Sequence, residues 1–457
     1  MLENSCALVL AAGKGTRMHS GDRPKVLAEL LGRPMLWYVH RALAPVFEDR
    51  VHTVVGHGAD LVAAAFPEHK DRFIHQAEQL GTGHALQVAW PRLKALGLRY
   101  VVVVNGDTPL LDTASVEKLT ERAASSGAAV TFLTISPEGE NAYGRVLRDE
   151  SGAVLGIVEK RDFDQSKHGP EPREVNAGIY CLDMERVAPL LDWLGNSNKA
   201  REYYITDLVE LAMADQEGVE AVECGSDEGL MGVNTPAELV LAEERLRESI
   251  VAGHAASGAL IRNPAACRIG PEATIAPGAD ITGPCEITGQ AVLARSCRVE
   301  PFCHVIESWL AEGSLVRSFS HLEQAEVGPG CVVGPYARLR TGSVLEEKAK
   351  VGNFVEMKKA VLGKGSKASH LTYLGDAEIG AGVNIGAGTI TCNYDGRNKH
   401  RTVIRDGAFI GSNTALVAPV EIGADALVGA GSTITKNVSP GHLAVTRAKQ
   451  AEVRKRK

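Results

Sequence analysis

Aromatic residues, paired cysteines and long apolar runs are all scarce in this 457-residue chain. Aromatic residues make up only 5% of it, and no apolar run approaches the length that spans a bilayer. The nine cysteines are scattered singly, with no C-x-x-C pair, which argues against a disulfide framework or a zinc site. The N-terminus carries no signal-peptide pattern. These absences predict a cytoplasmic protein with reduced thiols and no stable membrane association.

An excess of basic residues is also missing, because the formal net charge is -7 at pH 7. Proteins that bind nucleic acids usually carry a basic patch, so the charge does not favour a nucleic-acid partner. The apolar content of 44% and the charged content of 23% are ordinary for a globular protein with a sizeable core. At this length two or three domains are expected.

Glycine, in contrast, is abundant, with 48 residues, and much of it falls in a six-residue repeat of the C-terminal half. The period fits neither a helix nor the alternation of an ordinary strand, and it is typical of a parallel β-helix. Each repeat forms one wall of a triangular prism, and its aliphatic side chain points inward. The span predicts roughly nine or ten coils of about 18 residues. The aliphatic positions are Ile269, Ile275, Ile281, Ile287, Leu293, Val299 and Val305, then Val327, Val333, Leu339, Leu345 and Val351, then Ile379, Ile385, Ile404, Ile410, Leu416, Ile422, Val428 and Ile434.

The N-terminal half instead alternates short apolar strands with helical stretches. This alternation favours an α/β, Rossmann-like domain with a mostly parallel sheet and helices on both faces. The expected strands are Ala7–Leu10, Val51–Val55, Tyr100–Val104 and Val130–Thr134, and the expected helices are Pro34–Ala44, Gly83–Leu96 and Thr113–Ser125.

One amphipathic helix, Leu239–Val251, is expected to join the two halves. Thr235 can cap this helix, and Pro236 suits its first position. We therefore expect an α/β domain over 1–230, a linker helix over 231–252, a β-helix over 253–446 and a basic tail over 447–457.

The first expected strand leads into a glycine-rich turn, Leu10-Ala-Ala-Gly13-Lys-Gly15-Thr-Arg17, which is followed by Pro24-Lys25. Such a turn brings backbone N–H groups close to a phosphate. Arg17 and Lys25 can add two positive charges. The spacing matches neither the dinucleotide fingerprint nor a Walker A loop, and Gly-x-Gly alone could be only a tight turn.

Two further stretches carry candidate ligand groups. In Gln76-Ala-Glu-Gln-Leu-Gly81-Thr82-Gly, a glutamine amide beside glycines can read the edge of a uracil, although a polar turn before a helix is an alternative. Asn105-Gly-Asp107 ends an apolar strand, where ligands bind in open α/β sheets. Its lone carboxylate is a candidate Mg²⁺ ligand, or alternatively the cap of the next helix.

Together these motifs resemble those of the sugar-nucleotide pyrophosphorylases, which transfer a nucleotidyl group from a nucleoside triphosphate to a sugar 1-phosphate. The resemblance implies catalytic roles for Arg17 and Lys25, and a Mg²⁺ ion held by Asp107 and Asn234. The implied UTP and sugar-nucleotide contacts are Leu10, Ala11, Ala12, Gly13, Lys25, Gln76, Gly81, Thr82, Asn105, Asp107, Gly144, Glu159, Asn176 and Asn234.

The second half carries a more specific pattern of polar residues that a generic repeat does not need. It reads Val351-Gly-Asn-Phe-Val-Glu356-Met-Lys358-Lys, then Ser-His370-Leu-Thr-Tyr373, then Asn384-Ile-Gly-Ala387, then Asn393-Tyr394. With both halves in view, the chain resembles, almost end to end, the bifunctional bacterial N-acetylglucosamine-1-phosphate uridyltransferase/glucosamine-1-phosphate acetyltransferase family. That family implies a left-handed β-helix, acetyl-CoA as a second co-substrate, and a homotrimer with acetyl-transfer sites at subunit boundaries.

Acetyl transfer needs a general base for the sugar ammonium group. His370 suits this role because the pKa of a histidine lies near neutrality. A lone histidine is more often structural, and the resemblance is what assigns it as the base. The implied contacts of glucosamine 1-phosphate are Arg340, Lys358, Tyr373 and Asn384. The implied contacts of acetyl-CoA are Ala387, Asn393, Tyr394, Ser412, Ala430 and Arg447, although small residues at coil corners and a solvated arginine would look the same.

Three functions remain as hypotheses. The first is the bifunctional enzyme, which acetylates glucosamine 1-phosphate and then transfers UMP from UTP to the product. The second is a nucleotidyltransferase with a regulatory β-helix, as in the ADP-glucose enzymes, and the motif around His370 argues against it. The third is a non-catalytic scaffold, and the pattern from Gly13 to Lys25 argues against that.

Overall fold

The computed structural model describes residues 4–18 and 21–455, and its contacts divide the chain into two compact units, Met1–Glu243 and Glu244–Lys457. The division falls inside helix α8 (Pro236–Ala256). Within the described part of the chain, every helix is too short or too polar to cross a bilayer. The last two residues of the tail expected at 447–457 lie outside the described residues.

The first unit is built on a nine-stranded sheet with the main order β11-β7-β10-β6-β1-β4-β5. Its pairs are parallel except around β10, which runs antiparallel to β6 and β7, and in the β8–β9 hairpin. The strands are β1 (Ser5–Ala11), β4 (Val51–Val55), β5 (Phe73–His75), β6 (Tyr100–Asn105), β7 (Val130–Ile135), β8 (Arg145–Arg148), β9 (Val154–Val158), β10 (Val175–Asp183) and β11 (Val219–Glu223), with a separate pair β2 (Glu29–Leu30) and β3 (Arg33–Pro34).

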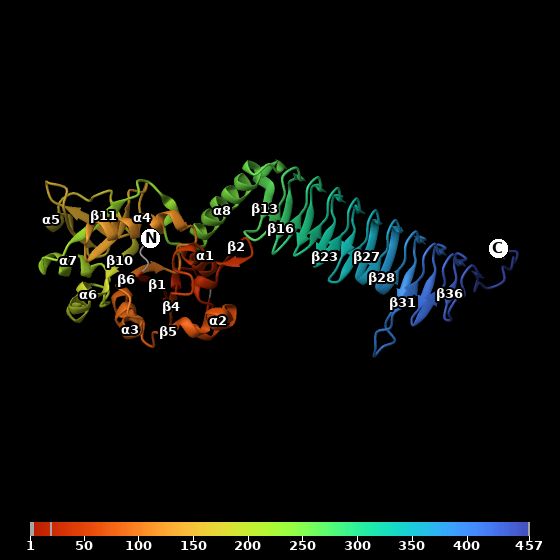
Figure 1. Cartoon of the computed structure of the whole chain (residues 1–457), viewed down its shortest axis with the longest axis horizontal. Helices are drawn as coiled ribbons and strands as arrows, with labels where there is room; N and C mark the ends of the chain where they lie inside the picture. Colours follow the sequence, from red (N-terminus) through yellow and green to blue (C-terminus); the bar gives the residue numbers. More distant parts are fainter. Residues whose placement is uncertain (1–3, 19–20, 456–457) are drawn as a thin grey trace. The chain divides into compact units, whose positions relative to one another are not determined.

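Helices cover both faces of this sheet, as Figure 1 shows. Alternate residues of β1 enter two different cores: Ala7 and Val9 pack in one cluster, and Cys6 and Leu8 in the other. The predicted mostly parallel α/β sheet is therefore confirmed. The helices are α1 (Met35–Phe47), α2 (Ala59–Ala65), α3 (Thr82–Lys94), α4 (Thr113–Ser126), α5 (Gln165–His168), α6 (Met184–Val187) and α7 (Asp207–Ala214).

Helix α8 begins at Pro236, directly after the predicted cap residue Thr235. The Thr235 hydroxyl accepts a hydrogen bond from the Glu238 N–H, and the Glu238 carboxylate accepts one from the Thr235 N–H, both at 3.2 Å. This reciprocal arrangement is a capping box. The helix extends past the predicted Leu239–Val251 at both ends.

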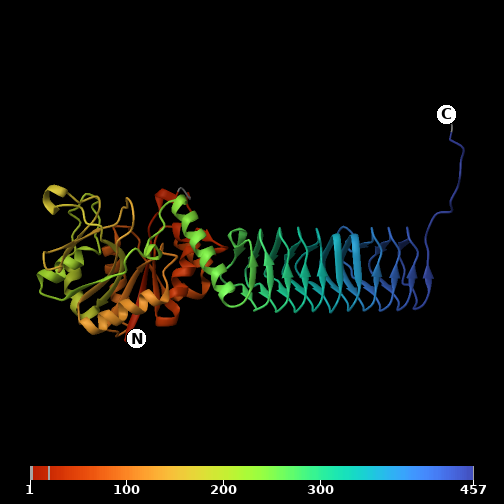
Figure 2. The same cartoon turned by 90° about the horizontal axis from the view of Figure 1, so that it is seen from above.

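The second unit is a stack of parallel coils with three walls (Figure 2). Most strands pair with the strand three places further on, because one coil contains three strands. The first wall is β12 (Leu260–Arg262), β15 (Asp280–Thr282), β18 (Arg298–Val299), β21 (Leu315–Val316), β24 (Val332–Val333), β29 (Asn384–Ile385), β32 (Phe409–Ile410), β35 (Leu427–Val428) and β37 (Leu443–Ala444).

The second wall is β13 (Cys267–Ile269), β16 (Cys285–Thr288), β19 (Cys303–Ile306), β22 (His321–Glu323), β25 (Arg338–Leu339), β30 (Ile390–Cys392), β33 (Ala415–Val417) and β36 (Thr433–Ile434). The third wall is β14 (Thr274–Ile275), β17 (Val292–Leu293), β20 (Trp309–Leu310), β23 (Ala325–Val327), β26 (Ser343–Leu345), β31 (Thr402–Ile404) and β34 (Val420–Ile422). Two long strands, β27 (Lys350–Leu362) and β28 (Lys367–Ile379), run over all three walls.

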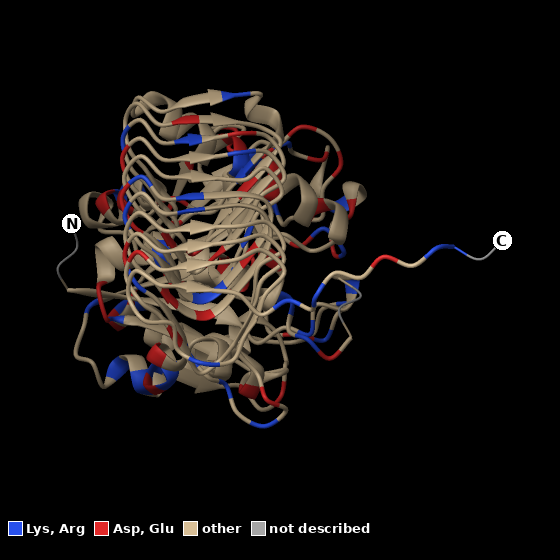
Figure 3. Ribbon diagram, turned by 90° about the vertical axis from the view of Figure 1, so that its right-hand side faces the viewer, with Lys and Arg blue, Asp and Glu red and all other residues tan. Residues whose placement is uncertain are grey.

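The aliphatic repeat positions point inward, as predicted, and all of them are buried. They form one continuous core that follows the stack. Between Val305 and Val327 the inward row continues through Leu310, Val316 and Leu322, so two of its steps are five residues long and depart from the strict six-residue period. The chain stays hydrogen-bonded to the last coil as far as Thr446, and the tail beyond Arg447 carries both basic and acidic residues (Figure 3).

Candidate active sites

A cavity of about 530 Å³ opens at the end of β1 in the first unit. The predicted glycine-rich turn forms part of its wall. The predicted residues that line it are Leu10, Ala11, Ala12, Gly13, Arg17, Lys25, Gln76, Gly81, Thr82, Asn105, Asp107 and Asn234. The carboxyl ends of β1 and β6 therefore bring distant segments of the sequence to one place, as expected for an open α/β sheet.

The glycine-rich turn folds back over Lys25 because Gly15 adopts a left-handed backbone, with φ of 60°. A Cβ atom at Gly15 would lie 2.5 Å from the Cβ of Lys25, so no larger residue fits there without a shift. Glycine is the residue that tolerates both the conformation and the close approach. The turn therefore packs directly against the Lys25 side chain.

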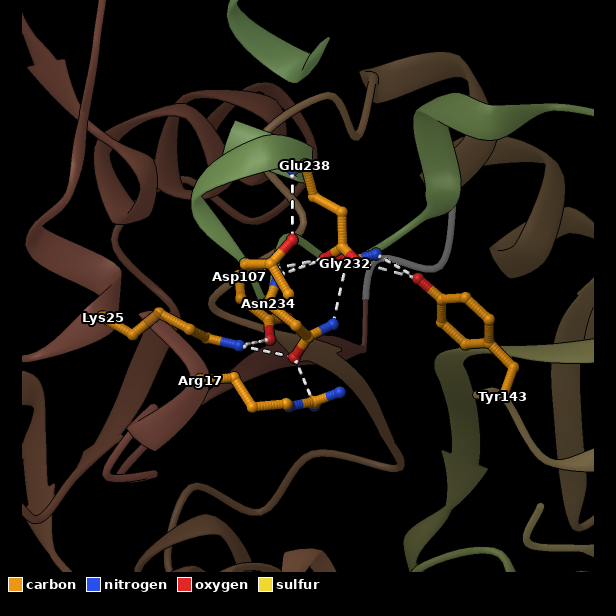
Figure 4. Close-up of polar contacts among 8 residues, drawn as sticks. Arg17, Lys25, Asp107, Tyr143, Gly232, Asn234 and Glu238 are labelled. Atoms are coloured by element: carbon orange, nitrogen blue, oxygen red, sulfur yellow. Dashed lines mark hydrogen bonds and ion pairs between the residues drawn. The ribbon is translucent and has the colours of Figure 1, made fainter. Parts of the chain in front are cut away.

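Arg17, Lys25, Asp107 and Asn234 converge on one point (Figure 4). The Lys25 ammonium contacts the Asp107 carboxylate and donates to Asn234 Oδ1 at 2.9 Å, and Arg17 donates to the same Asn234 oxygen at 2.9 Å. Asp107 does not cap the next helix, because Asp112 accepts from Ser115 N–H at 2.8 Å and caps α4. The alternative role considered for Asp107 is therefore wrong.

The donor set at this point fits a magnesium ion. One carboxylate oxygen and one amide oxygen already share a cation, the Lys25 ammonium. Mg²⁺ prefers oxygen ligands and usually takes only one or two from the protein, the remainder coming from phosphate and water. In the described part of the chain, no group of three or more His, Cys, Asp or Glu side chains could hold a metal ion.

Gln76, the residue predicted to contact the base, is buried at the cavity wall. The Gln76 amide donates to the Gly81 carbonyl at 3.3 Å and contacts His84 Nδ1 at 2.9 Å. Gly81 has a φ of 112°, and a Cβ atom there would lie 2.4 Å from the Tyr203 carbonyl oxygen. The loop can approach that backbone only because residue 81 is glycine. These contacts fix the orientation of the Gln76 amide at the cavity wall.

The three predicted sugar-binding residues lie together, but they are not among the residues that line the cavity. The Asn176 N–H donates to the Gly144 carbonyl at 2.9 Å, and a Cβ atom on Gly144 would lie 3.5 Å from Glu159 Oε1. The Glu159 carboxylate accepts from the Thr206 hydroxyl at 3.2 Å. Burial raises the pKa of Glu159 above its usual range, with the Thr206 hydrogen bond opposing this shift. Asn176 is fixed by its Nδ2 donating to the Tyr180 hydroxyl at 2.6 Å.

In the second unit, His370 lies at the corner between the first and second walls, where β28 turns. Its Nδ1 is 2.6 Å from the side-chain oxygen of Asn353, the residue paired with it on β27. Because a carbonyl oxygen can only accept, this contact places the hydrogen on Nδ1. The other ring nitrogen, Nε2, is then the proton acceptor, which is the state a general base requires.

Positive charge gathers on the second wall beside His370. Arg340 donates to Glu356 at 2.8 Å. The pKa of Lys358 is lowered, first by the charge of Lys399 and then by that of Arg340. Mutual repulsion of this kind between neighbouring cations marks a place where an anion would bind favourably.

The remaining predicted contacts lie on the first and second walls and in the loop after β30. Tyr373 is paired with Glu356 on the second wall, and the Asn393 amide donates to Asp376. Asn384 instead lies on the first wall, in β29. The residues Ala387, Ser412 and Ala430 follow the first-wall strands, and Arg447 packs beside Gly429 and Gly431. Tyr394 is exposed in the loop after β30, where its hydroxyl donates to the Gly396 carbonyl at 2.7 Å.

Comparison with known proteins matches both halves. Residues 7–257 match the model of a MobA-like NTP transferase domain, and residues 401–436 match the bacterial transferase hexapeptide model with six repeats. A bifunctional protein GlmU of Oleidesulfovibrio alaskensis is 58% identical over 98% of this chain and 97% of its own length. One of Nitratidesulfovibrio vulgaris is 57% identical over 99% of each chain, and one of Lawsonia intracellularis is 43% identical over 99% of this chain and 98% of its own. The chain belongs to the GlmU family.

Membership of the GlmU family confirms the first functional hypothesis. The chain is a bifunctional enzyme of UDP-N-acetylglucosamine synthesis, a uridyltransferase and an acetyltransferase. UTP and acetyl-CoA are accordingly its nucleotide and acetyl co-substrates. The hypotheses of a regulatory β-helix and of a non-catalytic scaffold are therefore wrong.

Several residues around the two sites were not predicted from the sequence. Arg161 and Glu202 line the cavity of the first unit. Asn353 and Lys399 complete the groups around His370 and Lys358. Asn353 could have been predicted, because it lies 17 residues before His370, about one coil earlier. The position of Lys399 depends on how the loop after β30 folds, and no periodic signal in the sequence encodes that.

Proposed function

We propose that uridyl transfer takes place in the cavity of the first unit, with Arg17, Lys25, Asp107 and Asn234 at its centre. The convergence of these four side chains on one point carries the proposal. In the reaction, a phosphate oxygen of N-acetylglucosamine 1-phosphate forms a bond to the α-phosphorus of UTP. The bond from the α-phosphorus to the bridging oxygen breaks, and pyrophosphate leaves.

The side chains of this site act by position and charge. Arg17 and Lys25 are placed to neutralise the phosphate oxygens, which carry more charge as the leaving group departs. Gln76 would hold the uracil, and Gly144, Glu159 and Asn176 would hold the sugar. Holding both reactants in line removes much of the entropic barrier. Asp107 and Asn234 would hold Mg²⁺, which supplies further charge neutralisation on the phosphates when bound.

We propose that acetyl transfer takes place at the corner that carries His370. His370 Nε2 would take the proton from the 2-ammonium group of glucosamine 1-phosphate, and the Asn353 oxygen would hold the ring in the required tautomer. The freed amine forms a bond to the thioester carbonyl carbon. The carbon–sulfur bond then breaks, and coenzyme A leaves as the thiol with the second proton that the amine nitrogen gives up. Arg340, Lys358 and Lys399 would hold the sugar phosphate.

The role of Lys399 gives one prediction. We expect Lys399→Ala to raise KM for glucosamine 1-phosphate about tenfold, the size expected when one charged hydrogen bond is lost. Because Lys399 depresses the pKa of Lys358, its removal lets Lys358 keep its proton to a higher pH. KM should rise at alkaline pH as Lys358 loses its proton. In the variant this rise should therefore move to higher pH. Steady-state kinetics between pH 7 and 10 measure both effects.

Arg397→Ala is the matched control, since it removes a cation from the same loop without touching Lys358. If KM and its rise at alkaline pH are both unchanged in Lys399→Ala, Lys399 is not part of the phosphate site.

We further propose that the enzyme is a homotrimer whose acetyl-transfer sites lie between subunits. The first support is the division of the predicted sugar contacts between two walls: Arg340, Lys358 and Tyr373 on the second, and Asn384 on the first. A flat ligand on one wall does not reach around the corner. A neighbouring copy that presents its first wall to the second wall of this chain would unite the two sets.

The second support is an exposed aromatic column at the corner that carries His370, formed by Phe302, Phe319, Tyr336 and Phe354. The rings stack in sequence, with centroids 4.8, 4.9 and 5.4 Å apart, and each is about half exposed. All four residues have positive φ, which is costly for a side chain other than glycine. A column of outward apolar rings held at such cost is typical of a surface that another protein covers.

The aromatic column gives a second prediction. We expect Phe319→Glu, in the middle of the column, to lower the mass measured by light scattering to that of a monomer at micromolar concentration. Acetyl transfer should fall with the trimer content, while uridyl transfer should stay unchanged because its site lies in the first unit.

Trp309→Glu is the control, because Trp309 is equally exposed, at 46%, but lies on the third wall. If the Phe319→Glu variant remains trimeric, or if its monomer acetylates at the normal rate, the aromatic column is not the subunit interface.

We propose a cytoplasmic location and the domain bounds 1–230, 231–252 and 253–446. Nine free cysteines support the location, since disulfides are rare in reducing compartments. Separate hydrophobic cores support the division, because each half can then fold by itself.

Expressing residues 1–252 and 253–457 separately tests the assignment of the two reactions. The first piece should transfer UMP only, and the second should transfer acetyl groups only. Uridyl transfer by the second piece, or acetyl transfer by the first, would contradict the assignment.

A further inference from the structure

The Tyr143 hydroxyl joins two loops that flank the uridyl-transfer cavity. It accepts a hydrogen bond from the Gly232 N–H at 2.9 Å and donates one to the Gly232 carbonyl at 3.3 Å (Figure 4). Burial raises the pKa of Tyr143 to about 12, so the hydroxyl keeps its proton at neutral pH and can make both bonds at once. One side chain thus satisfies both backbone groups of a single residue in the opposite loop.

Gly232 is the residue from which the proposed metal ligand Asn234 is positioned. Its carbonyl accepts from Asn234 Nδ2 at 3.1 Å, which turns Asn234 Oδ1 toward Lys25 and Arg17. The next residue, Val233, donates its N–H to the Asp107 carbonyl at 2.8 Å. A Cβ atom on Gly232 would lie 3.0 Å from Asp107 Oδ1, so the loop rests directly on that carboxylate. A shift of Gly232 therefore moves Asn234 relative to Asp107.

The other end of Tyr143 is tied to the sugar side of the site. We call Arg145, Lys160 and Glu171 the clasp. Glu171 Oε1 accepts from Arg145 Nε at 2.7 Å and also contacts the Lys160 ammonium. Arg145 in turn donates to the Tyr143 carbonyl at 2.6 Å and to Asn141 Oδ1 at 2.7 Å.

The members of the clasp are direct neighbours of the proposed sugar contacts. Arg145 follows Gly144, and Lys160 follows Glu159. Arg145 is almost fully buried, with 4% of its side chain exposed, so its position is fixed by these bonds and not by solvent. A continuous set of hydrogen bonds therefore runs from the residues beside the sugar, through Tyr143, to the loop that carries Asn234.

We propose that Tyr143 is a positioning residue that couples the sugar-binding side of the uridyl-transfer site to its metal-binding side, with the clasp holding Tyr143 in place. This inference rests on the proposed function, because it takes Gly144 and Glu159 as sugar contacts and Asp107 and Asn234 as metal ligands. A sugar phosphate that orders the clasp also orders Asn234, and by linkage the metal strengthens sugar binding by the same factor.

The test is calorimetric and needs no turnover. It measures the dissociation constant of UDP-N-acetylglucosamine for the full-length enzyme with and without Mg²⁺, and the ratio of the two values is the coupling factor. In Tyr143→Phe the coupling factor should fall about threefold to tenfold, which corresponds to the net contribution of one or two hydrogen bonds. With UMP, which has no sugar, the coupling factor should be the same in both proteins. Glu171→Gln should lower the coupling factor and also weaken UDP-N-acetylglucosamine binding without metal.

Matched controls remove the same groups elsewhere in the first unit. Tyr38→Phe deletes a buried hydroxyl that donates to the Leu30 carbonyl at 2.6 Å. Glu174→Gln breaks the Arg148–Glu174 pair, which joins the same two segments as the clasp but is not bonded to Tyr143. Both controls should keep the coupling factor of the unmutated enzyme.

The outcomes separate the inference from the proposed function. A coupling factor that falls in Asn234→Ala but is unchanged in both folded Tyr143→Phe and Glu171→Gln would overturn the coupling and leave the metal site standing. A coupling factor of one in the unmutated enzyme, or an unchanged one in Asn234→Ala, would overturn the metal site and the coupling together. Glu171 has 40% of its side chain exposed, so Glu171→Gln tests the coupling even if Tyr143→Phe does not fold.

Discussion

Replacing His370 by alanine is expected to lower kcat for acetyl transfer about 10²–10⁴-fold. The acetyl acceptor must be a neutral amine, yet an amine is largely protonated at pH 7. The contact of His370 Nδ1 with the Asn353 oxygen at 2.6 Å leaves Nε2 as the acceptor for that proton. KM for glucosamine 1-phosphate should change less than kcat, because the phosphate contacts proposed for Arg340, Lys358 and Lys399 are kept. Uridyl transfer should be unaffected.

The competing explanation is that His370 stabilises a coil corner. Loss of the side chain would then lower the melting temperature and the trimer content before it lowered turnover. Measuring kcat and the melting temperature on the same trimeric preparation distinguishes the two, with His254→Ala as the control histidine of the same unit. A stable His370→Ala trimer with near-normal acetyl transfer would remove His370 from the mechanism.

Replacing Asp107 by asparagine is expected to lower uridyl transfer by about 10³-fold or more, the scale of losing a central electrostatic group. The change keeps the size of the side chain and removes its negative charge. Asp107 faces Lys25 and lies beside Asn234, so the variant loses both the ion pair and the carboxylate ligand proposed for Mg²⁺. Acetyl transfer should stay near its normal rate.

Asp112→Asn provides the matched control five residues further on, because it makes the same chemical change at the cap of α4. Asparagine is also a good cap, so this control should retain both activities. Assays of both half-reactions on each full-length variant settle the matter. Loss of both activities in Asp107→Asn would indicate misfolding, and full uridyl transfer would exclude Asp107 from the site.

The elements with a strict physical period were predictable from the sequence. The aliphatic positions of the repeat are buried because each wall needs one inward side chain per coil. The start of α8 was predictable from Thr235 and Pro236, because capping is a local interaction. The steps of five residues around Leu310 and Val327 were not, because they depend on how each corner closes.

In the two sites, too, the residues fixed by local or periodic patterns were predictable, and the residues placed by irregular loops were not. Gly13, Asp107 and Lys25 were recognisable, because strand ends and glycine-rich turns meet at one edge of the sheet. Asn353 was missed although the coil period places it next to His370. Glu171 and Lys399 could not have been predicted, because each acts from a loop whose path no local pattern fixes.

The coil stack has one further consequence, for how this half of the chain can change over generations. Each coil is hydrogen-bonded only to the coil before it and the coil after it, so its stability is close to a sum of nearest-neighbour terms. A complete coil far from β27 and β28 can be removed or duplicated. The coils that then become neighbours pair with the same hydrogen bonds and continue the same row of inward side chains. The number of turns can therefore drift between lineages while the reaction centre is inherited intact, and whole turns can be exchanged between related genes.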